Sequence, residues 1–152
     1  MNVRTLADDE VALVDAHLPL DRLDQFRLGN SCYLVAWDEE APVGHAHLAW
    51  PSVELREPSL PELQDVYVVA TRRREGIATA LTEAAELEAK ARGFAQLMLS
   101  FGVENEAARL LYERAGYSDA GLDPVRVTGT ILIRGRPMEV DDTLVYLVKS
   151  LA

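Results

Sequence analysis

The chain has 152 residues, which suits one domain built around a single core, and we expect residues 1–152 to form one domain. Its formal net charge of −10 comes from 15 basic and 25 acidic side chains. This balance argues against a nucleic-acid-binding protein, because affinity for phosphate backbones depends on lysine and arginine. The negative charge favours either a cationic, amine-bearing partner or simple solubility.

Hydropathy and cysteine content narrow the class further. No apolar run approaches the roughly 20 residues that span a bilayer, and Met1–Arg4 does not lead into a signal-peptide apolar region. We therefore expect a cytoplasmic protein with no membrane partner. Cys32 is the only cysteine, which excludes a disulfide framework, and its apolar neighbours predict a packed core thiol rather than a reactive one.

The first half of the chain predicts short elements and one hairpin. A helix can begin at Asp8 or Asp9, because aspartate caps helix N-termini, and Gly29 ends a second helix. Two β-rich runs joined by a polar turn of hairpin length should pair antiparallel. The expected elements are a strand at 2–6, helices at 8–16 and 21–28, strands at 32–37 and 43–50, and a proline-containing loop at 51–61 that approaches the substrate.

The second half predicts two units in which a helix follows a strand. The helix at 76–92 carries an apolar stripe of helical period formed by Ile77, Ala80, Leu81, Ala84, Leu87 and Ala91. The other expected elements are strands at 63–69 and 95–101, a helix at 105–115, and a final hairpin with strands at 125–134 and 143–148 around the turn 135–137. The fold class is α/β or α+β with a mixed sheet.

The loop Arg73–Ala78 carries the clearest chemical signal. It follows the apolar run 66–69 and opens the amphipathic helix, so several backbone N–H groups at the helix start are free to hold an anion. Gly76 permits close backbone approach or an unusual φ, and the small Ala78 leaves room at the helix start. Three adjacent arginines, at 72–74, add positive charge in an otherwise acidic chain.

Two sequence blocks together resemble a known family. The run Arg73-Arg74-Glu75-Gly76-Ile77-Ala78 matches a loop with Gln or Arg, two free positions, Gly, one free position, and Gly or Ala. Downstream, residues 105–117 contain the asparagine, alanine, Leu-Tyr-Glu and Gly-Tyr positions of a second block. Both blocks are similar to those of the GNAT superfamily of acyl-CoA-dependent N-acetyltransferases, and the resemblance covers about residues 30 to 117.

The resemblance implies a GNAT-like domain whose central, twisted, mostly antiparallel sheet has roughly six to seven strands with about four helices around it. It also implies a bulge that splays the fourth strand from the fifth, with the pantetheine arm of acetyl-CoA in the gap. The main chain of Val66, Tyr67 and Val68 would pair with that arm while their side chains serve the core. The residues implied at the CoA pyrophosphate, mainly through main-chain atoms, are Arg73, Arg74, Glu75, Gly76, Ile77, Ala78 and Thr79.

Acetyl transfer to an amine needs a neutral nitrogen, an oxyanion donor and a proton for the leaving thiolate. By resemblance, Tyr112 is the general acid that protonates the CoA sulfur, and a strand N–H, of Val66 or Val68, holds the oxyanion. Asn105 would hold the pantetheine arm or cap its own helix, and the two roles are compatible.

Glu62 is the candidate general base. It stands where some members of the family place a carboxylate, and strand alternation puts it on the face of Gln64 and Val66. A substrate-attracting role for Glu62, or an ordered water as the base, stays open.

His45 and His47 share one strand face by alternation, which suggests a metal pair or a base. No third ligand accompanies them in the sequence, so ordinary packing or lining of the substrate side is favoured. We expect no metal site.

These motifs predict an N-acetyltransferase that moves an acetyl group from acetyl-CoA directly to a primary amine of an unidentified acceptor in a ternary complex. The alternative is a non-catalytic CoA-binding module that acts as a sensor or assembly domain. A nucleotide-binding protein is disfavoured, because the loop lacks the Gly-Lys-Ser/Thr ending of a P-loop. The expected partners are acetyl-CoA and a cationic acceptor bound by 8–28, 51–61 and the final hairpin, whose exposed edge also makes a homodimer a candidate assembly.

Overall fold

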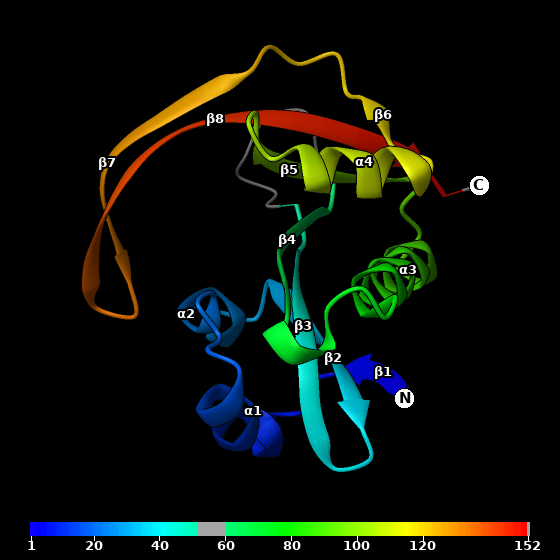
Figure 1. Ribbon diagram of the computed structural model, residues 1–152, viewed down its shortest axis with the longest axis vertical. Coiled ribbons are helices and arrows are strands. Elements are labelled where there is room, and N and C mark those ends of the chain that lie inside the picture. The colour runs from blue at the N-terminus through cyan, green and yellow to red at the C-terminus, as the bar shows by residue number, and fades with distance from the viewer. Residues whose placement is uncertain (52–59, 152) are drawn as a thin grey trace.

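The protein folds around one mixed sheet, and the computed structural model describes residues 1–51 and 60–151. Within these residues the sheet has eight strands in the order β1-β2-β3-β4-β5-β8-β6, and β7 pairs with β8 (Figure 1). The elements are β1 (Asn2–Thr5), α1 (Val11–His17), α2 (Leu23–Arg27), β2 (Ser31–Asp38), β3 (Ala41–Ala49), β4 (Glu62–Val68), α3 (Ile77–Ala91), β5 (Gln96–Gly102), α4 (Glu106–Arg114), β6 (Ser118–Asp119), β7 (Val125–Ile133) and β8 (Arg136–Ser150), with short 3₁₀ turns at Asp8–Glu10 and Ala70–Arg72.

This architecture confirms the mixed, mostly antiparallel sheet and the four α-helices expected from the sequence. The eighth strand is β6, which has only two residues and carries too little pattern to be predicted. The predicted loop at 51–61 falls almost entirely outside the described residues.

Strand β2 separates two apolar cores, because alternate side chains point to opposite faces of the sheet. Leu34 and Ala36 belong to the core that also contains the buried side chains of α3. The other core lies beneath the α1 and α2 segment and consists of Leu6, Val14, Leu18, Leu20, Leu23, Tyr33, Val35 and Trp37. Since both faces of β2 are covered, the run at 32–37 reads as continuously apolar.

Helix α3 packs against the sheet through side chains spaced four residues apart. Its buried apolar residues are Ile77, Leu81, Ala85 and Ala89. The predicted stripe was wrong in part, because Leu87 was assigned to it and is 70% exposed. In so alanine-rich a helix, two neighbouring faces fit the helical period almost equally well, so periodicity alone does not select the buried one.

Strands β4 and β5 form the parallel pair of the described sheet, and they stay together over only two residue pairs, Glu62–Met98 and Leu63–Leu99. Beyond these pairs β4 continues beside β3, whereas β5 continues beside β8 (Figure 1). The splay implied by the resemblance is therefore present, and it separates two strands in the middle of the sheet.

Strands β7 and β8 form a long hairpin that arches away from the rest of the sheet (Figure 1). The turn is Arg134–Gly135, with φ values of +53° and +79°, which suits a two-residue hairpin turn. The strand expected at 143–148 therefore begins earlier, at Arg136, and the turn expected at 135–137 is shifted. Pairing with β7 continues without a break from Arg136 to Leu144, and the later part of β8 pairs with β5.

Candidate active site

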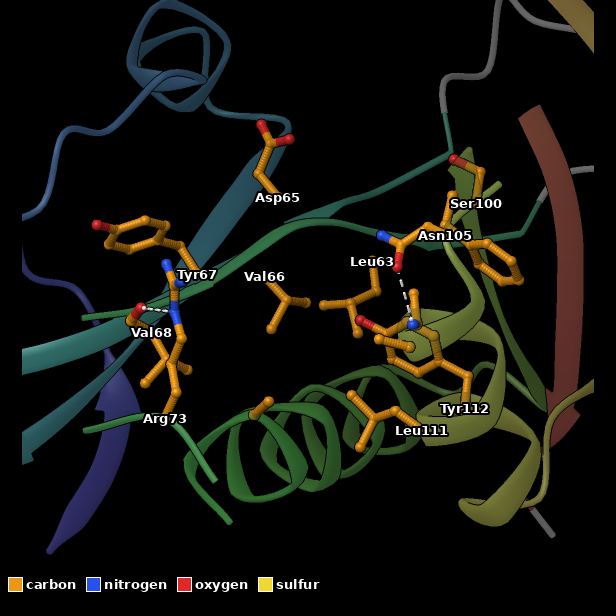
Figure 2. Close-up of a pocket in the computed structure, with 14 residues that line it drawn as sticks. Leu63, Asp65, Val66, Tyr67, Val68, Arg73, Ser100, Asn105, Leu111 and Tyr112 are labelled. Atoms are coloured by element: carbon orange, nitrogen blue, oxygen red, sulfur yellow. Dashed lines mark hydrogen bonds between the residues drawn. The ribbon is translucent and has the colours of Figure 1, made fainter. Parts of the chain in front are cut away.

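A β-bulge in β4 shapes the centre of the molecule. One residue of β3, Ala46, stands opposite two residues of β4, Asp65 and Val66, and the register shifts there. The extra residue reverses the alternation, so Leu63 and Val66 point to the same side of the strand (Figure 2). The prediction that Glu62 shares a face with Val66 was wrong, because it assumed unbroken alternation.

The gap between β4 and β5 contains a cavity of about 530 Å³, which we call the arm cavity. Leu63 and Val66 face Asn105 and Tyr112 across it, and the first turn of α3 contributes Ala78 (Figure 2). The cavity is thus enclosed by β4, β5, α3 and α4. A cavity beside a splayed strand can take an extended chain whose amide groups pair with the strand backbone.

A second cavity of about 510 Å³, the loop cavity, surrounds the start of α3. It shares Val68, Ala78, Ala107 and Leu111 with the arm cavity, so the two are contiguous. Gly76 precedes the helix with φ +83° and ψ +10°, and the N–H groups of the first turn, residues 77–79, lack partners inside the helix. This arrangement favours binding of an anion at the helix N-terminus.

The basic residues of the loop cavity are Arg72, Arg74 and Arg114. Arg72 is already engaged, because it donates to Asp38 at 2.7 Å and to Glu75 at 2.9 Å. Arg74 is exposed, and Arg114 comes from α4. These two guanidinium groups therefore add positive charge beside the free N–H groups of α3.

The residues expected at an anion are brought together with two exceptions. Arg74, Gly76, Ile77, Ala78 and Thr79 all line the loop cavity. Arg73 lines the arm cavity instead, where its Nε donates to the carbonyl oxygen of Val68 at 3.1 Å (Figure 2). Glu75 lines neither cavity, and its carboxylate accepts the hydrogen bond from Arg72. Arg114 was not predicted at this site. It follows Leu110, which also lines the loop cavity, by one helical turn in the second sequence block, so helical spacing could have identified it.

Tyr112 is buried in the wall of the arm cavity. Its ring stacks on Phe101 with centroids 6.2 Å apart and meets Tyr117 edge-on at 5.9 Å. The hydroxyl points from α4 toward β4 (Figure 2). Burial raises the pKa of Tyr112 to about 12, so the phenol keeps its proton at neutral pH and can donate it into the cavity.

Asn105 caps α4 and also lines the arm cavity. Its Oδ1 accepts a hydrogen bond from the N–H of Ala108 at 3.0 Å, which confirms the capping role. The amide nitrogen points the other way, toward β4 (Figure 2). One side chain therefore closes the helix and offers a donor to whatever occupies the cavity.

Glu62 stands at the start of β4, outside the residues that line the arm cavity. Its carboxylate accepts a hydrogen bond from the Oγ of Ser100 at 3.0 Å, and Ser100 does line the cavity. The base role of Glu62 stays a prediction. Ser100 was missed, and its only signal was a single hydroxyl within the otherwise apolar run 97–101.

A third cavity of about 300 Å³ lies on the other side of the bulge, and we call it the acceptor cavity because Pro19 and Asp21 line it and belong to the segment 8–28 that is expected to bind the acceptor. It shares Asp65, Val66 and Tyr67 with the arm cavity, so the bulge is the wall between the two. Asp65 pairs with Arg22 at 2.6 Å. The remaining lining residues are Pro19, Asp21 and His45.

The side chain of Tyr67 does not serve the core, contrary to expectation. It is 40% exposed, stacks on the ring of His45 at 5.6 Å, and lies beneath the guanidinium of Arg73 at 5.8 Å. The bulge explains this: in a regular strand Tyr67 would share a face with the buried Leu63, whereas the extra residue places Tyr67 on the opposite face.

Three further findings concern the thiol, metal binding and membrane-spanning helices. Burial raises the pKa of Cys32 to about 11, which fits an inert thiol. Among the described residues, no group of three His, Cys, Asp or Glu side chains is arranged to hold a metal ion. Across residues 1–51 and 60–151, no helix combines the length and apolarity needed to cross a bilayer.

Comparison of the sequence with family models gives one match. The model described as the acetyltransferase (GNAT) family matches residues 3–117, about three quarters of the chain. A search of curated protein sequences finds no match.

Three solved structures with the same fold are distant from this chain in sequence. An acetyltransferase from Bacillus subtilis in complex with CoA is 16% identical, with a TM-score of 0.70 and 99% of both chains covered. A GNAT family acetyltransferase from Elizabethkingia anophelis with acetyl-CoA bound is 16% identical, with a TM-score of 0.69, covering 98% of this chain and 97% of that one. A ribosomal-protein-alanine N-acetyltransferase from Brucella melitensis is 20% identical, with a TM-score of 0.70 and 99% of both chains covered. These likenesses establish the fold.

Proposed function

Since the chain belongs to the GNAT acetyltransferase family, we propose that it transfers the acetyl group of acetyl-CoA to a primary amine. The observation that carries the proposal is the continuity of the loop cavity with the arm cavity, which Tyr112 lines. A pyrophosphate held by the first turn of α3 would direct the pantetheine arm along β4. The thioester would then reach the bulge.

The bulge supplies the groups that the reaction needs at the thioester. Val66 is out of register with β3, so we assign its N–H to the thioester oxygen, where negative charge develops. Tyr112 gives its proton to the leaving sulfur from the opposite wall.

The acetyl group passes directly from donor to acceptor in this proposal. The arm cavity and the acceptor cavity meet at the bulge, so a thioester and an amine can approach the same atoms from opposite sides. Cys32 is not among the residues that line either cavity, so no cysteine there offers itself as a nucleophile. We therefore assign a ternary complex without an acetylated protein.

The acceptor is a cationic amine. Asp21 and Asp65 line the acceptor cavity, and the chain carries a net charge of −10. Both features attract an ammonium group. The volume of about 300 Å³ admits the amine end of an acceptor and leaves a larger remainder outside.

Two measurements test the function. Isothermal titration calorimetry with acetyl-CoA, CoA and ATP should give binding for the first two ligands only. A thiol-release assay with acetyl-CoA and a panel of polyamines, aminoglycosides, amino acids, peptides and protein lysines should then give turnover with one class. Tight binding with no turnover on any amine would instead support a non-catalytic CoA-binding module, and binding of ATP alone would reject the CoA site.

A further inference from the structure

Two buried histidines lie on β3 beside the bulge. His45 is 3% exposed and His47 is fully buried. The Nε2 of His45 lies 3.1 Å from the carbonyl oxygen of Pro19, and the Nδ1 of His47 lies 3.0 Å from Oε1 of Gln64. The second ring nitrogen of each histidine is buried and has no hydrogen-bond partner among residues 1–51 and 60–151.

The partner of His45 determines its tautomer. A proline carbonyl can only accept, so Nε2 of a neutral His45 carries the hydrogen and Nδ1 keeps a free lone pair. A buried lone pair without a hydrogen-bond partner costs free energy. Such an atom in a folded protein therefore calls for an explanation, and a catalytic role is one. For His47 the partner is an amide, which can accept or donate after rotation, so its tautomer is not fixed in this way.

Only one of the two histidines borders a cavity. His45 lines the acceptor cavity, whereas His47 lines none of the cavities described above. Three of the other residues of the acceptor cavity, Asp65, Val66 and Tyr67, also line the arm cavity. His45 is therefore on the amine side of the bulge, one strand away from the position assigned to the thioester.

The charges around His45 suit a group that gains a proton. Burial lowers the pKa of His45 below its usual value, while the carbonyl of Pro19, the carboxylates of Asp65 and Asp21, and the backbone of Asp65 pull it upward. Arg22 faces the same region but is paired with Asp65. The other groups against the ring are the uncharged Tyr33, Tyr67 and His47.

We propose that His45 is the general base of this enzyme and takes the proton that the acceptor ammonium must lose before it can attack. The inference rests on the acetyl transfer proposed above. The proton passes from the acceptor nitrogen to Nδ1, directly or through one water molecule, and His45 becomes an imidazolium stabilised by the two nearby carboxylates.

The step balances without any further reagent. The neutral nitrogen attacks the thioester carbon, the C–N bond forms, and the C–S bond breaks with its electron pair on sulfur. The thiolate takes a proton from Tyr112, and the second proton lost by the acceptor nitrogen restores the phenol through solvent. His45 finally releases its own proton to solvent, so one proton is produced for each amide formed from an ammonium.

The alternative general base is Glu62. The carboxylate of Glu62 is held by Ser100, and Glu62 lines neither the arm cavity nor the acceptor cavity. His45 lines the acceptor cavity and its buried Nδ1 has no hydrogen-bond partner among the described residues, so His45 is a better candidate than Glu62 for a proton that leaves from this cavity.

The first test uses the unmodified protein. Histidine side-chain ¹⁵N NMR at pH 7.5 should give His45 as the neutral Nε2–H tautomer, identified by loss of its signals in His45→Gln. The Nδ1–H tautomer or an imidazolium at that pH would overturn the proposal, because Nδ1 would then have no lone pair to offer.

The second test is a pH profile of kcat with acetyl-CoA and the best amine of the panel. His45→Gln keeps an amide N–H for the Pro19 carbonyl but has no basic nitrogen, so kcat at pH 7.5 should fall about a hundredfold or more. The wild-type profile should fall on the acid side as His45 becomes protonated, below pH 6.5, and the variant should lose that limb. Affinity for acetyl-CoA should not change.

His47→Asn is the matched control, because it removes an equally buried ring while keeping a side-chain donor for Gln64. It should keep the acid limb. Equal losses in both variants would assign His45 to packing, and loss of the limb in Glu62→Gln alone would assign the base to Glu62. A wild-type protein that acetylates no amine would reject the acetyl transfer itself, whereas turnover with an unchanged His45→Gln profile would reject only the role of His45.

Discussion

The Tyr112 hydroxyl enters the arm cavity from a cluster of aromatic rings. Stacking on Phe101 and edge contact with Tyr117 fix the orientation of the phenol, so little rotational freedom is left to lose when a thioester binds. The same burial raises its pKa to about 12 and keeps the hydroxyl protonated over the whole range in which an amine acetyltransferase works. Position and protonation state therefore have one physical origin.

Tyr112→Phe should lower kcat roughly a hundredfold and leave the Kd for acetyl-CoA nearly unchanged, because only the donated proton is lost. Steady-state kinetics and calorimetry on the same preparation check this. Tyr117→Phe is the control: it removes another buried hydroxyl, one that bonds to Glu86 away from the arm cavity, and should cost about 1 kcal/mol of stability without lowering kcat. Unchanged turnover in Tyr112→Phe would remove the phenol from the mechanism.

The place of a residue in the candidate site could be predicted where the residue belongs to a local sequence motif. Asn105 caps α4 and Tyr112 lies two turns further on, so their spacing puts both on one side of the helix. The lone pair of His45 was not predictable, because the carbonyl that fixes its tautomer comes from Pro19, 26 residues earlier. Sequence alternation identifies a shared face but not the partner that each ring nitrogen finds across it.

At the scale of elements, the loop before α3 depends on one backbone conformation. Gly76 has φ +83°, which non-glycine residues adopt only at a cost of about 1–2 kcal/mol. A Cβ at Gly76 would meet no atom within 4 Å, so the free protein has room for a side chain there. The glycine is needed for its conformation and for the approach of a ligand.

Gly76→Val should abolish CoA binding measured by calorimetry while the protein stays folded. Gly29→Val is the matched control, because Gly29 has φ +86° with equally open surroundings but lies after α2, outside the cavities. Both variants should lose similar stability in thermal unfolding, and only the first should lose CoA. Normal CoA affinity in Gly76→Val would show that the anion site lies elsewhere.

The bulge in β4 is the second element on which the site depends. Deletion of Asp65 should restore a regular register with β3, reverse the side chains that follow, and abolish CoA binding. Asp65→Gly should keep CoA affinity, because glycine accepts the φ of +51° and preserves the residue count. Amide hydrogen exchange would detect extended pairing of β4 in the deletion variant; CoA binding by that variant would contradict the role given to the bulge.

Sequence patterns locate these elements but not their irregularities. The loop at residues 73–78 could be predicted because glycine and arginine at fixed spacing directly reflect its backbone and charge. A bulge adds one residue to a strand and has no characteristic sequence. The bulge in β4 was therefore expected only from the family resemblance, and its effect on the direction of the Tyr67 side chain was not predicted. The exposed Leu87 was missed for a related reason, since burial depends on which face of α3 meets the sheet.

At the scale of the molecule, the terminal hairpin returns to the start of the chain. Arg134, at the β7–β8 turn, bonds to the carboxylate of Asp15 in α1, which also accepts from the N–H of Leu20. Segments 119 residues apart are thereby joined on the side of the sheet that holds α1 and α2. The segment between α1 and α2 provides Pro19 and Asp21 to the acceptor cavity, so the contact braces that wall.

Asp15→Asn should loosen the tip of the hairpin with little effect on global stability, less than about 1 kcal/mol, because the pair is partly exposed. Arg134 lowers the pKa of Asp15, so the stabilisation is present above the usual carboxyl pKa and disappears as the pH falls through the lowered value. Hydrogen exchange at residues 131–138 should therefore accelerate in the variant at neutral pH and in the wild type only under acid conditions. Equal protection in both proteins at pH 7 would refute the brace.

The early separation of β4 from β5 gives the sheet two edges in its interior. Exposed strand edges normally invite pairing with other chains and hence aggregation, and proteins blunt them with charges, prolines or covering elements. Here α3 and α4 stand over the opening, leaving a passage of about 530 Å³ in place of an open edge. The two helices thus act as the covering elements of these interior edges, and the backbone groups of β4 that β5 leaves unpaired border a cavity rather than an open sheet edge.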